Sequence, residues 1–231
     1  DVQSTSSASP AAFRAEVRDW ISRNAPAGLA ELVDWTSPPM TGGDRAAFER
    51  AEADPRYEEW SRRLLDGGWI CPQWPERFGG RGLTPVQNAI YSEELVRAGL
   101  PRIRRGFGEN MVGPSIMVHG TEEQQKHFLP RIITAEDVYC QGFSEPEQGS
   151  DLGGVQTRGT VVGDEVVVTG QKVWTSGFYK ANMIFVLCRT DPEAPKHKGL
   201  SYVLLPMRDN NIDARPLKQL TGSAEFGEEF I

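Results

Sequence analysis

The feature that most constrains the fold is a change of sequence pattern near residues 135–138. Before it, apolar residues recur at helical spacing; after it, β-branched residues and glycines dominate and the helical periodicity disappears. Helical runs followed by strand runs are typical of the α+β class. We therefore predict an N-terminal all-α domain over residues 1–136, followed by an antiparallel, barrel-like or sandwich-like middle β-domain over residues 137–231.

Capping residues place the helices of the first part. Ser9-Pro10 and Thr121 each predict a helix start, the latter as part of a capping box. Pro55 divides a helical pattern over residues 44–66 into two pieces, because a proline interrupts a helix. Pro114 predicts a fresh helix after a break.

A further helix is predicted to begin at Thr84-Pro85, after an irregular loop over residues 69–83 that is rich in Trp, Pro and Gly. Its apolar residues indicate an inward face, and its charged residues indicate an outward face. The expected inward residues are Val86, Ile90 and Leu95, and the expected outward residues are Glu93, Glu94 and Arg97.

Apolar, β-branched runs mark the strands of the second part. Gly163-Asp164 lies between the first two runs and predicts a hairpin turn. Another apolar run begins at Phe226. The earlier runs are Val155–Val162, Glu165–Gln171, Met183–Arg189, Leu200–Leu205 and Ile212–Leu217.

Charge and composition exclude several classes of protein. The 25 basic and 32 acidic residues give a net charge of −7, which argues against a surface for nucleic acid or anionic membranes. No apolar run is long enough to span a bilayer. Neither the three histidines nor the three cysteines show disulfide or metal-ligand spacing; the cysteines are Cys71, Cys140 and Cys188. We predict a cytoplasmic protein with reduced thiols and no metal.

Two segments differ from ordinary packing sequences. The first, residues 141–151, leads from a strand-like start into a loop dense in Ser, Gly and Pro. The second, residues 170–177, ends a β-branched run on Trp174, which is followed by two hydroxyl residues. Together they offer hydroxyl and backbone N–H donors beside one flat aromatic face. A flavin ring requires that combination, because its edge accepts hydrogen bonds and its faces accept stacking.

At these segments the chain resembles the acyl-CoA dehydrogenase family, whose members carry T/S-E-P-x-x-G-S-D and G-x-K-x-W-x-T/S. The motifs stand here as Ser144–Asp151 and Gly170–Ser176, and two further matches lie upstream, over Trp74–Thr84 and Gly113–Pro130. Four motifs in the family's order make the resemblance specific. It implies a helical N-terminal domain, a middle β-domain, and a C-terminal four-helix bundle that we expect to be absent from this chain.

The resemblance implies FAD as the cofactor. The hydroxyl and backbone N–H of Ser144 would face the flavin, backbone groups at Gln141 and Phe143 would meet its pyrimidine end, and Trp174 would pack against the ring. The residues alone leave other roles open: Ser144 as a turn cap, Phe143 as a core aromatic, and Trp174 as strand-edge packing. The complete cofactor-binding set is Gln141, Phe143, Ser144, Gly149, Ser150, Trp174, Thr175 and Ser176.

The resemblance also implies substrate contacts. In the family, the serine at Ser150 lies near the pantetheine chain of coenzyme A. The segment with Phe107, Asn110 and Met111 corresponds to a wall of the acyl pocket, although a helix that packs on its neighbour is the plainer alternative. Glu145 is not expected to act as a base, because a glutamate in a Glu-Pro turn more readily accepts backbone N–H bonds and ties down its loop.

The implied function is α,β-dehydrogenation of an acyl-CoA thioester, with hydride transfer to flavin N5. The family's catalytic base lies in the C-terminal domain, so no catalytic residue is predicted here. The implied partners are an acyl-CoA substrate, an electron-transfer flavoprotein as acceptor, and further subunits in a homo- or hetero-oligomer, a dimer or a tetramer. Two alternatives remain open: a flavin-dependent oxidase or monooxygenase on the same fold, and a non-catalytic flavin- or CoA-binding subunit of a hetero-oligomer.

Overall fold

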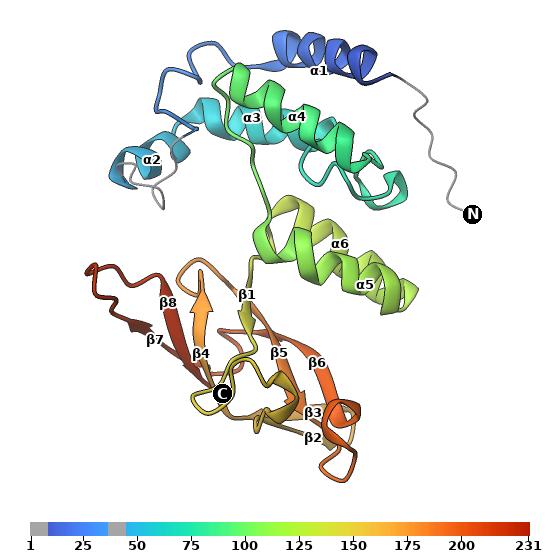
Figure 1. Cartoon of the computed structure of the whole chain (residues 1–231), viewed down its shortest axis with the longest axis vertical. Coiled ribbons are helices and arrows are strands. Elements are labelled where there is room, and N and C mark those ends of the chain that lie inside the picture. The colour runs from blue at the N-terminus through green and yellow to red at the C-terminus, as the bar shows by residue number, and fades with distance from the viewer. Residues whose placement is uncertain (1–8, 37–44) are drawn as a thin grey trace. The chain divides into compact units, whose positions relative to one another are not determined.

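The computed structural model describes residues 9–36 and 45–231 (Figure 1). The chain forms two compact units, Asp1–Arg105 and Gly106–Ile231. Helices come first along the chain and strands follow from residue 139 onward, which confirms the predicted α+β class. The division between the units falls before the last two helices, and the domain boundary at residue 136 stays a prediction. None of the helices in the described ranges has both the length and the apolar character needed to cross a bilayer.

Local caps fix the helices of the first unit. Ser9 accepts a hydrogen bond from Ala12 N at 3.3 Å, and Thr84 and Gln87 form a capping box, so both predicted starts are confirmed. The split at Pro55 is also confirmed, while residue 44 lies outside the described residues. The helices are α1 (Pro10–Asn24), α2 (Arg45–Glu52), α3 (Pro55–Asp66) and α4 (Pro85–Arg97).

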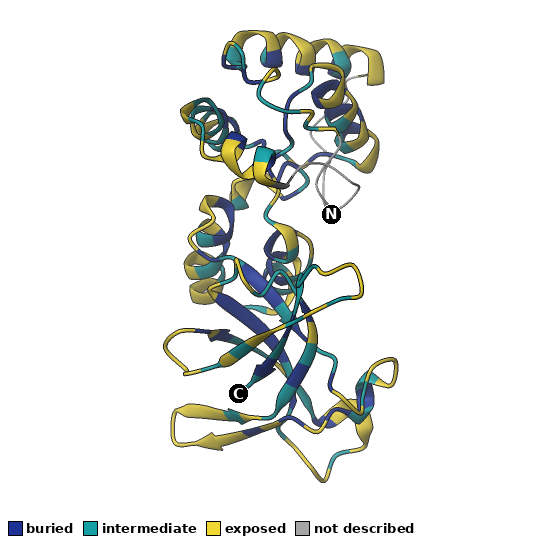
Figure 2. Ribbon diagram, turned by 90° about the vertical axis from the view of Figure 1, so that its left-hand side faces the viewer, coloured by how far each residue is buried: buried dark blue, intermediate teal, exposed yellow. Residues whose placement is uncertain are grey.

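Aromatic rings form the centre of this unit. Trp20 packs against Trp60 and Trp69 with ring centroids 5.5 and 5.3 Å apart, and Trp69 stacks on Tyr91 at 4.8 Å. Trp60 Nε1 donates to Pro101 O at 3.0 Å, so its polar edge is satisfied inside the core. Figure 2 shows how buried and exposed positions alternate along the helices.

The buried face of α4 differs from the predicted one. Val86 is 59% exposed, whereas Glu94 is only 2% exposed. Arg14 Nη1 and Arg18 Nε donate to the two Glu94 oxygens at 2.5 and 2.6 Å, and the bond from Arg18 is the main cause that holds the pKa of Glu94 below its usual value. The outward prediction for Glu94 was wrong because arginines of α1 neutralise its carboxylate. The expected positions are confirmed for Ile90, Leu95, Glu93 and Arg97.

Replacing Glu94 by alanine is expected to lower the free energy of unfolding by about 1–3 kcal/mol, because Arg14 and Arg18 lose charge-assisted hydrogen bonds and a buried side chain is lost. Glu93→Ala is the matched control. Glu93 also pairs with Arg14, but its side chain is 58% exposed, and the expected change is within about 0.5 kcal/mol. Urea denaturation of both variants measures the difference, and equal losses would contradict the buried role of Glu94.

The second unit begins with a helix that changes its pitch. Residues 108–112 form a π-helical turn, η3, followed without a break by α5 (Gly113–His119). Gly113 N donates to Gly108 O, five residues back, and Pro114, which has no N–H to donate, follows directly. The predicted break before Pro114 was therefore wrong, since a wider helical turn accommodates the proline.

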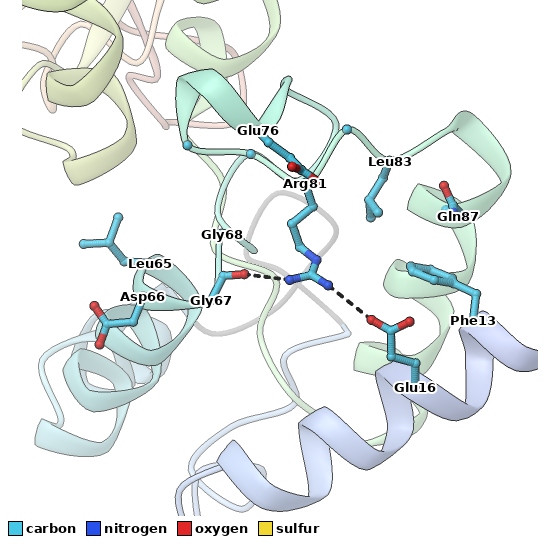
Figure 3. Close-up of a pocket in the computed structure, with 13 residues that line it drawn as sticks. Phe13, Glu16, Leu65, Asp66, Gly67, Gly68, Glu76, Arg81, Leu83 and Gln87 are labelled. Atoms are coloured by element: carbon cyan, nitrogen blue, oxygen red, sulfur yellow. Dashed lines mark hydrogen bonds and ion pairs between the residues drawn. The ribbon is translucent and has the colours of Figure 1, made fainter. Parts of the chain in front are cut away.

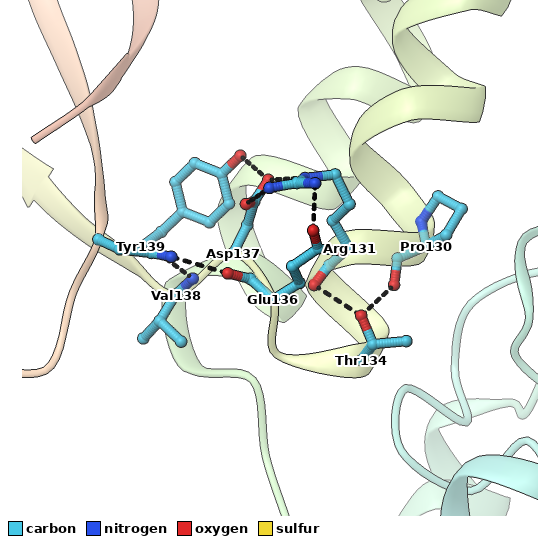
Figure 4. A network of polar contacts seen from close by, with 8 residues as sticks. Pro130, Arg131, Thr134, Glu136, Asp137, Val138 and Tyr139 are labelled. Atoms are coloured by element: carbon cyan, nitrogen blue, oxygen red, sulfur yellow. Dashed lines mark hydrogen bonds and ion pairs between the residues drawn. The ribbon is translucent and has the colours of Figure 1, made fainter. Parts of the chain in front are cut away.

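A polar network joins α6 (Glu122–Thr134), which begins at the predicted capping box, to the first strand, β1 (Tyr139–Gly142) (Figure 4). Arg131 donates two hydrogen bonds to the Asp137 carboxylate, from Nε to Oδ2 at 3.0 Å and from Nη2 to Oδ1 at 2.7 Å. Asn182 Oδ1 accepts the backbone N–H immediately before β1 at 2.8 Å. These bonds fix the start of the strand that leads into the first motif.

The strands of the second unit form two sheets. One sheet has the order β1-β5-β2-β3, with β6 also paired to β5, and the other has the order β4-β8-β7. The first contains β1 and the strands β2 (Arg158–Val162), β3 (Glu165–Thr169), β5 (Met183–Arg189) and β6 (Leu200–Pro206). The second contains β4 (Gln171–Ser176), β7 (Asp213–Leu217) and β8 (Phe226–Phe230).

The strands confirm one prediction and correct three others. The hairpin at Gly163-Asp164 is confirmed by the antiparallel β2 and β3. β1, however, runs parallel to β5, with Tyr139 opposite Met183, which is possible because three strands intervene between them in the chain. The run from Val155 becomes a strand only at residue 158, and Gln171 begins β4 in the other sheet rather than ending β3.

Residues from both sheets share one apolar core. The fully buried part comes from the larger sheet and the loop after it, and Ala214 and Ile231 from the segments of the smaller sheet pack against it. This arrangement agrees with the sandwich-like prediction. The buried members are Cys140, Ile184, Val186, Cys188, Leu205 and Met207.

Candidate functional site

The two segments predicted to bind flavin, residues 141–151 and 170–177, lie side by side in the second unit. Val173 N on β4 donates to Ser144 O, just beyond the end of β1, at 2.9 Å. Lys172 Nζ donates to Phe143 O at 3.1 Å. Figure 1 shows β1 and β4 as neighbours. Segments that are far apart in the sequence therefore form one local structure.

A buried ion pair holds this structure together. Lys172 is 0% exposed, and its Nζ lies 2.8 Å from Glu145 Oε1 and donates to Leu187 O at 2.8 Å. Glu145 also accepts the backbone N–H groups of Gln156 at 2.6 Å and Thr157 at 2.9 Å. The expectation that Glu145 ties down its loop by accepting backbone N–H bonds is confirmed.

The electrostatics of the pair agree with a structural role. Burial raises the pKa of Glu145, but hydrogen bonds from Lys172 and Thr157 outweigh it and hold that pKa below its usual value. Burial lowers the pKa of Lys172, and the hydrogen bond with Glu145 opposes this effect. A carboxylate with a lowered pKa and both oxygens engaged is a poor proton acceptor, which agrees with the prediction that Glu145 is not a general base.

Trp174 projects from an irregularity in β4. Its φ is +64°, in the left-handed region, and the register of β4 against β8 shifts between Val173 and Thr175. Its side chain is 61% exposed, and its ring meets Phe226 edge-on with centroids 6.0 Å apart. A strained, non-glycine residue that presents a large ring outward is the arrangement expected where a ligand binds.

The same bulge turns Thr175 inward. The side chain of Thr175 is fully buried, and its Oγ1 donates to Glu229 Oε2 on β8. The Thr175 hydroxyl is therefore engaged inside the sheet, and a cofactor can meet this residue through its backbone. Ser176, at the end of β4, is partly exposed and lies opposite Phe226 in the register.

The loop of the first motif leaves open space. Glu145 and Gln148 exchange two backbone hydrogen bonds of 2.8 and 3.1 Å, which close a tight turn. Gly149 and Ser150 follow it and are exposed, and a Cβ placed on Gly149 would meet nothing within 4 Å. A ligand can therefore approach this backbone closely. Ser144, at the start of the turn, is partly exposed.

The residues predicted for the acyl-pocket wall adjoin the first motif. Gln141 Nε2 lies 3.5 Å from Met111 Sδ. Phe107 and Phe143 both pack edge-on against Phe185, with ring centroids 5.8 and 5.4 Å apart. Two of the three wall residues are thus in the same cluster as the strand residues predicted for the flavin.

Asn110, the third wall residue, is exposed, and its Nδ2 donates to Gly106 O at 3.0 Å. This bond lies within its own helical turn. Its role toward an acyl group stays a prediction.

Sequence reasoning missed three residues that support this site. Lys172 stands inside the second motif, and a lysine within a β-branched run is a signal of a buried partner that could have been used. The burial of Glu229 could not be predicted from the sequence. Side chains alternate between the two faces of a strand, so the run Phe-Gly-Glu-Glu-Phe predicts that one glutamate faces inward but does not identify which one. Phe226 was assigned only to a strand, yet it supports the Trp174 ring.

The chemistry of these residues fits a flavin. The exposed Trp174 lies on the strand that bonds to Ser144 and ends at Ser176, two partly exposed hydroxyl residues. The backbone at Gly149 is open to a ligand. Within residues 9–36 and 45–231, no group of three histidine, cysteine or acidic side chains is placed to hold a metal ion.

The motif over residues 74–84 builds a different feature, in the first unit. It lines a cavity of about 550 Å³ together with residues of α1 and the end of α3 (Figure 3). Arg81 crosses this cavity, donating to Gly67 O at 3.1 Å and pairing with Glu16 at 3.2 Å. Gly80 is required there, since a Cβ would lie 2.1 Å from Trp74 O. The motif thus ties helices together and contains none of the residues predicted for the flavin.

Comparison with known families is specific. Residues 43–136 match the N-terminal domain of acyl-CoA dehydrogenases, and residues 140–228 match the middle domain. The chain belongs to the acyl-CoA dehydrogenase family. The resemblance inferred from the four motifs is therefore confirmed.

Individual acyl-CoA dehydrogenases extend the comparison. The chain is 42% identical over 219 residues to acyl-CoA dehydrogenase IpdE1 of Mycobacterium tuberculosis, covering 95% of this chain and 54% of that protein. The Tcur3481-Tcur3483 steroid ACAD superposes with a TM-score of 0.68 at 33% identity, covering 97% of this chain and 55% of that one. The ChsE4-ChsE5 complex from Mycobacterium tuberculosis gives a TM-score of 0.70 at 28% identity, covering 100% and 54%. The chain therefore spans about half the length of the relatives it matches.

Proposed function

We propose that the whole protein is an FAD-dependent acyl-CoA dehydrogenase and that the second unit supplies one side of its flavin site. The observation that carries this proposal is Trp174, held at φ +64° and 61% exposed on the strand that bonds to the first motif through Val173 N and Ser144 O. Family membership supports the same cofactor and reaction class.

The residues of the chain would have separate roles toward the cofactor and the substrate. Trp174 would stack on the ring of FAD, while Ser144, Ser150 and Ser176 would donate hydrogen bonds to its polar edge or its chain. When bound, the flavin supplies the acceptor for the hydride that leaves the β-carbon of the acyl-CoA. The base that removes the α-proton would come from residues outside this chain, because Glu145 is engaged by Lys172 and two backbone N–H groups.

The acyl group would meet the wall formed by Phe107 and Met111. One solved neighbour is named a steroid ACAD, which supports steroid-derived acyl-CoA thioesters as a candidate substrate class beside straight-chain ones. The solved ChsE4-ChsE5 complex supports further subunits as partners. An electron-transfer flavoprotein is proposed as the electron acceptor.

The test uses the full-length protein. It is expected to carry FAD, visible in its absorption spectrum, and to lose that absorption when mixed anaerobically with a suitable acyl-CoA from a panel of straight-chain and steroid-derived thioesters. Rapid reoxidation by oxygen with peroxide formation would favour the oxidase alternative. FAD binding without reduction by any thioester would favour the non-catalytic subunit. A purified protein that neither carries nor takes up FAD would contradict the proposal.

Trp174→Ala is expected to raise the Kd for FAD about fivefold, because an aromatic face contributes on the order of 1 kcal/mol beyond its burial. Trp174→Phe is the matched control, since it keeps a ring at the same backbone position and should stay near the wild-type Kd. Fluorescence titration with FAD measures both. Unchanged affinity in the alanine variant would count against stacking on Trp174.

A further inference from the structure

Glu229 is a buried carboxyl for which the fold has no evident need. It lies on β8 between β4 and β7, with Lys172 and Ala214 opposite it in the register. Its side chain is 0% exposed; Oε2 accepts the Thr175 hydroxyl, and Oε1 has no hydrogen-bond partner among the described residues. A half-satisfied buried carboxyl costs stability, so an apolar side chain would serve the core better.

Among the described residues, the one side-chain hydrogen bond of Glu229 goes to Thr175, in the bulge of β4 next to Trp174. Thr175 follows Trp174 directly, and at this point the register of β4 against β8 shifts. The inward Thr175 side chain and the outward Trp174 ring share one peptide link. Whatever fixes Thr175 inside the sheet therefore also fixes the direction of the exposed indole.

We propose that Glu229 is a positioning residue for FAD: by accepting the hydrogen bond of the Thr175 hydroxyl, it locks the bulge that presents Trp174. The inference rests on the proposed function, since it concerns how well the chain receives the flavin.

The surroundings of Glu229 give its carboxyl few polar partners. Burial raises the pKa of Glu229 to about 7; the charge of Glu228 adds to this effect, and the Thr175 hydrogen bond opposes it. Cys140 faces it from β1, and burial followed by the charge of Glu229 raises the pKa of that thiol. Lys172 lies opposite on β4, but its Nζ is engaged by Glu145 and two backbone carbonyls. An ionised Glu229 thus has one hydroxyl as its hydrogen-bond partner.

The experiment measures the Kd of the full-length protein for FAD at one fixed pH. Glu229→Val and Thr175→Val each remove one partner of the hydrogen bond, and each is expected to raise the Kd several-fold. The double variant should raise the Kd no further than either single variant, because both changes break the same bond. Glu229→Gln keeps an acceptor for the Thr175 hydroxyl, so its Kd should stay near the wild-type value.

Glu228→Gln is the control for a carboxyl on the same strand. The Glu228 side chain accepts a hydrogen bond from Gln171 at 2.6 Å and has no part in the Thr175 bond, so the Kd of this variant should stay at the wild-type value. A Glu229→Val variant with the wild-type Kd, or a double variant whose loss is the sum of the two single losses, would overturn the inference while leaving FAD binding intact. A wild-type protein that binds no FAD would instead overturn the proposed function, and the positioning role with it.

Discussion

Replacing Lys172 by methionine is expected to lower the free energy of unfolding by about 3–5 kcal/mol, the largest effect of any single change considered for this chain. Methionine matches the length of the side chain but removes the charge. Glu145, 7% exposed, would then be left as a buried carboxylate without its cation. The carbonyls of Phe143 and Leu187 would lose the donor that Lys172 Nζ now supplies at 3.1 and 2.8 Å.

The matched control is Lys196→Met in the same unit. Lys196 pairs with Asp151 at 3.3 Å, but the two side chains are 69% and 58% exposed, so the expected loss is below about 1 kcal/mol. Urea denaturation of the full-length protein followed by circular dichroism compares the variants. The double variant Lys172→Met with Glu145→Gln should recover part of the loss, because it removes the unpaired charge. A Lys172→Met loss no larger than that of Lys196→Met would contradict the buried ion pair.

The Lys172→Met substitution should also weaken the candidate cofactor site. Lys172 holds Phe143 O and Glu145, which lie on either side of Ser144, and it immediately precedes Val173, whose N–H donates to Ser144 O. Weakening these bonds frees the first motif from β4. The Lys172→Met protein is therefore expected to retain less FAD than the Lys196→Met protein under conditions where both are folded, measured as the ratio of flavin to protein absorption.

Features governed by neighbouring residues were predictable from the sequence. Ser9, Thr84 and Thr121 cap helices through bonds that span three residues, and the Gly163-Asp164 turn closes a hairpin between adjacent runs. In such cases the residues that decide the structure stand together in the chain, so pattern and structure agree.

Features governed by distant residues were not predictable. Glu94 is buried because Arg14 and Arg18, on another helix, neutralise it, and no pattern within α4 contains that information. The parallel pairing of β1 with β5 likewise depends on strands that lie between them in the chain. Family motifs located the candidate cofactor residues, but they did not indicate that Glu229, beyond the last motif, would bind Thr175.

The stability of the wild-type protein is expected to fall as the pH rises from about 5 to about 8, through the titration of Glu229. Burial raises the pKa of this carboxyl from 4.5 to about 7 in the folded protein, with the Thr175 bond opposing and Glu228 adding to the rise. The folded state therefore holds the proton more tightly than the unfolded state. Its contribution is fully present below pH 4.5 and lost as the pH passes about 7, which corresponds to about 3 kcal/mol.

Glu229→Gln isolates this contribution, because every other titrating group is shared with the wild type. The free energies of unfolding of the two proteins are measured by urea denaturation at several pH values, without added FAD. The wild type is expected to lose about 3 kcal/mol relative to Glu229→Gln between the ends of the range, since only the wild type must bury a charge at high pH. A constant difference between the two curves would mean that Glu229 does not change its protonation in this range. Glu228→Gln should still lose stability as the pH rises, but by less than the wild type, because the charge of Glu228 contributes to the raised pKa of Glu229.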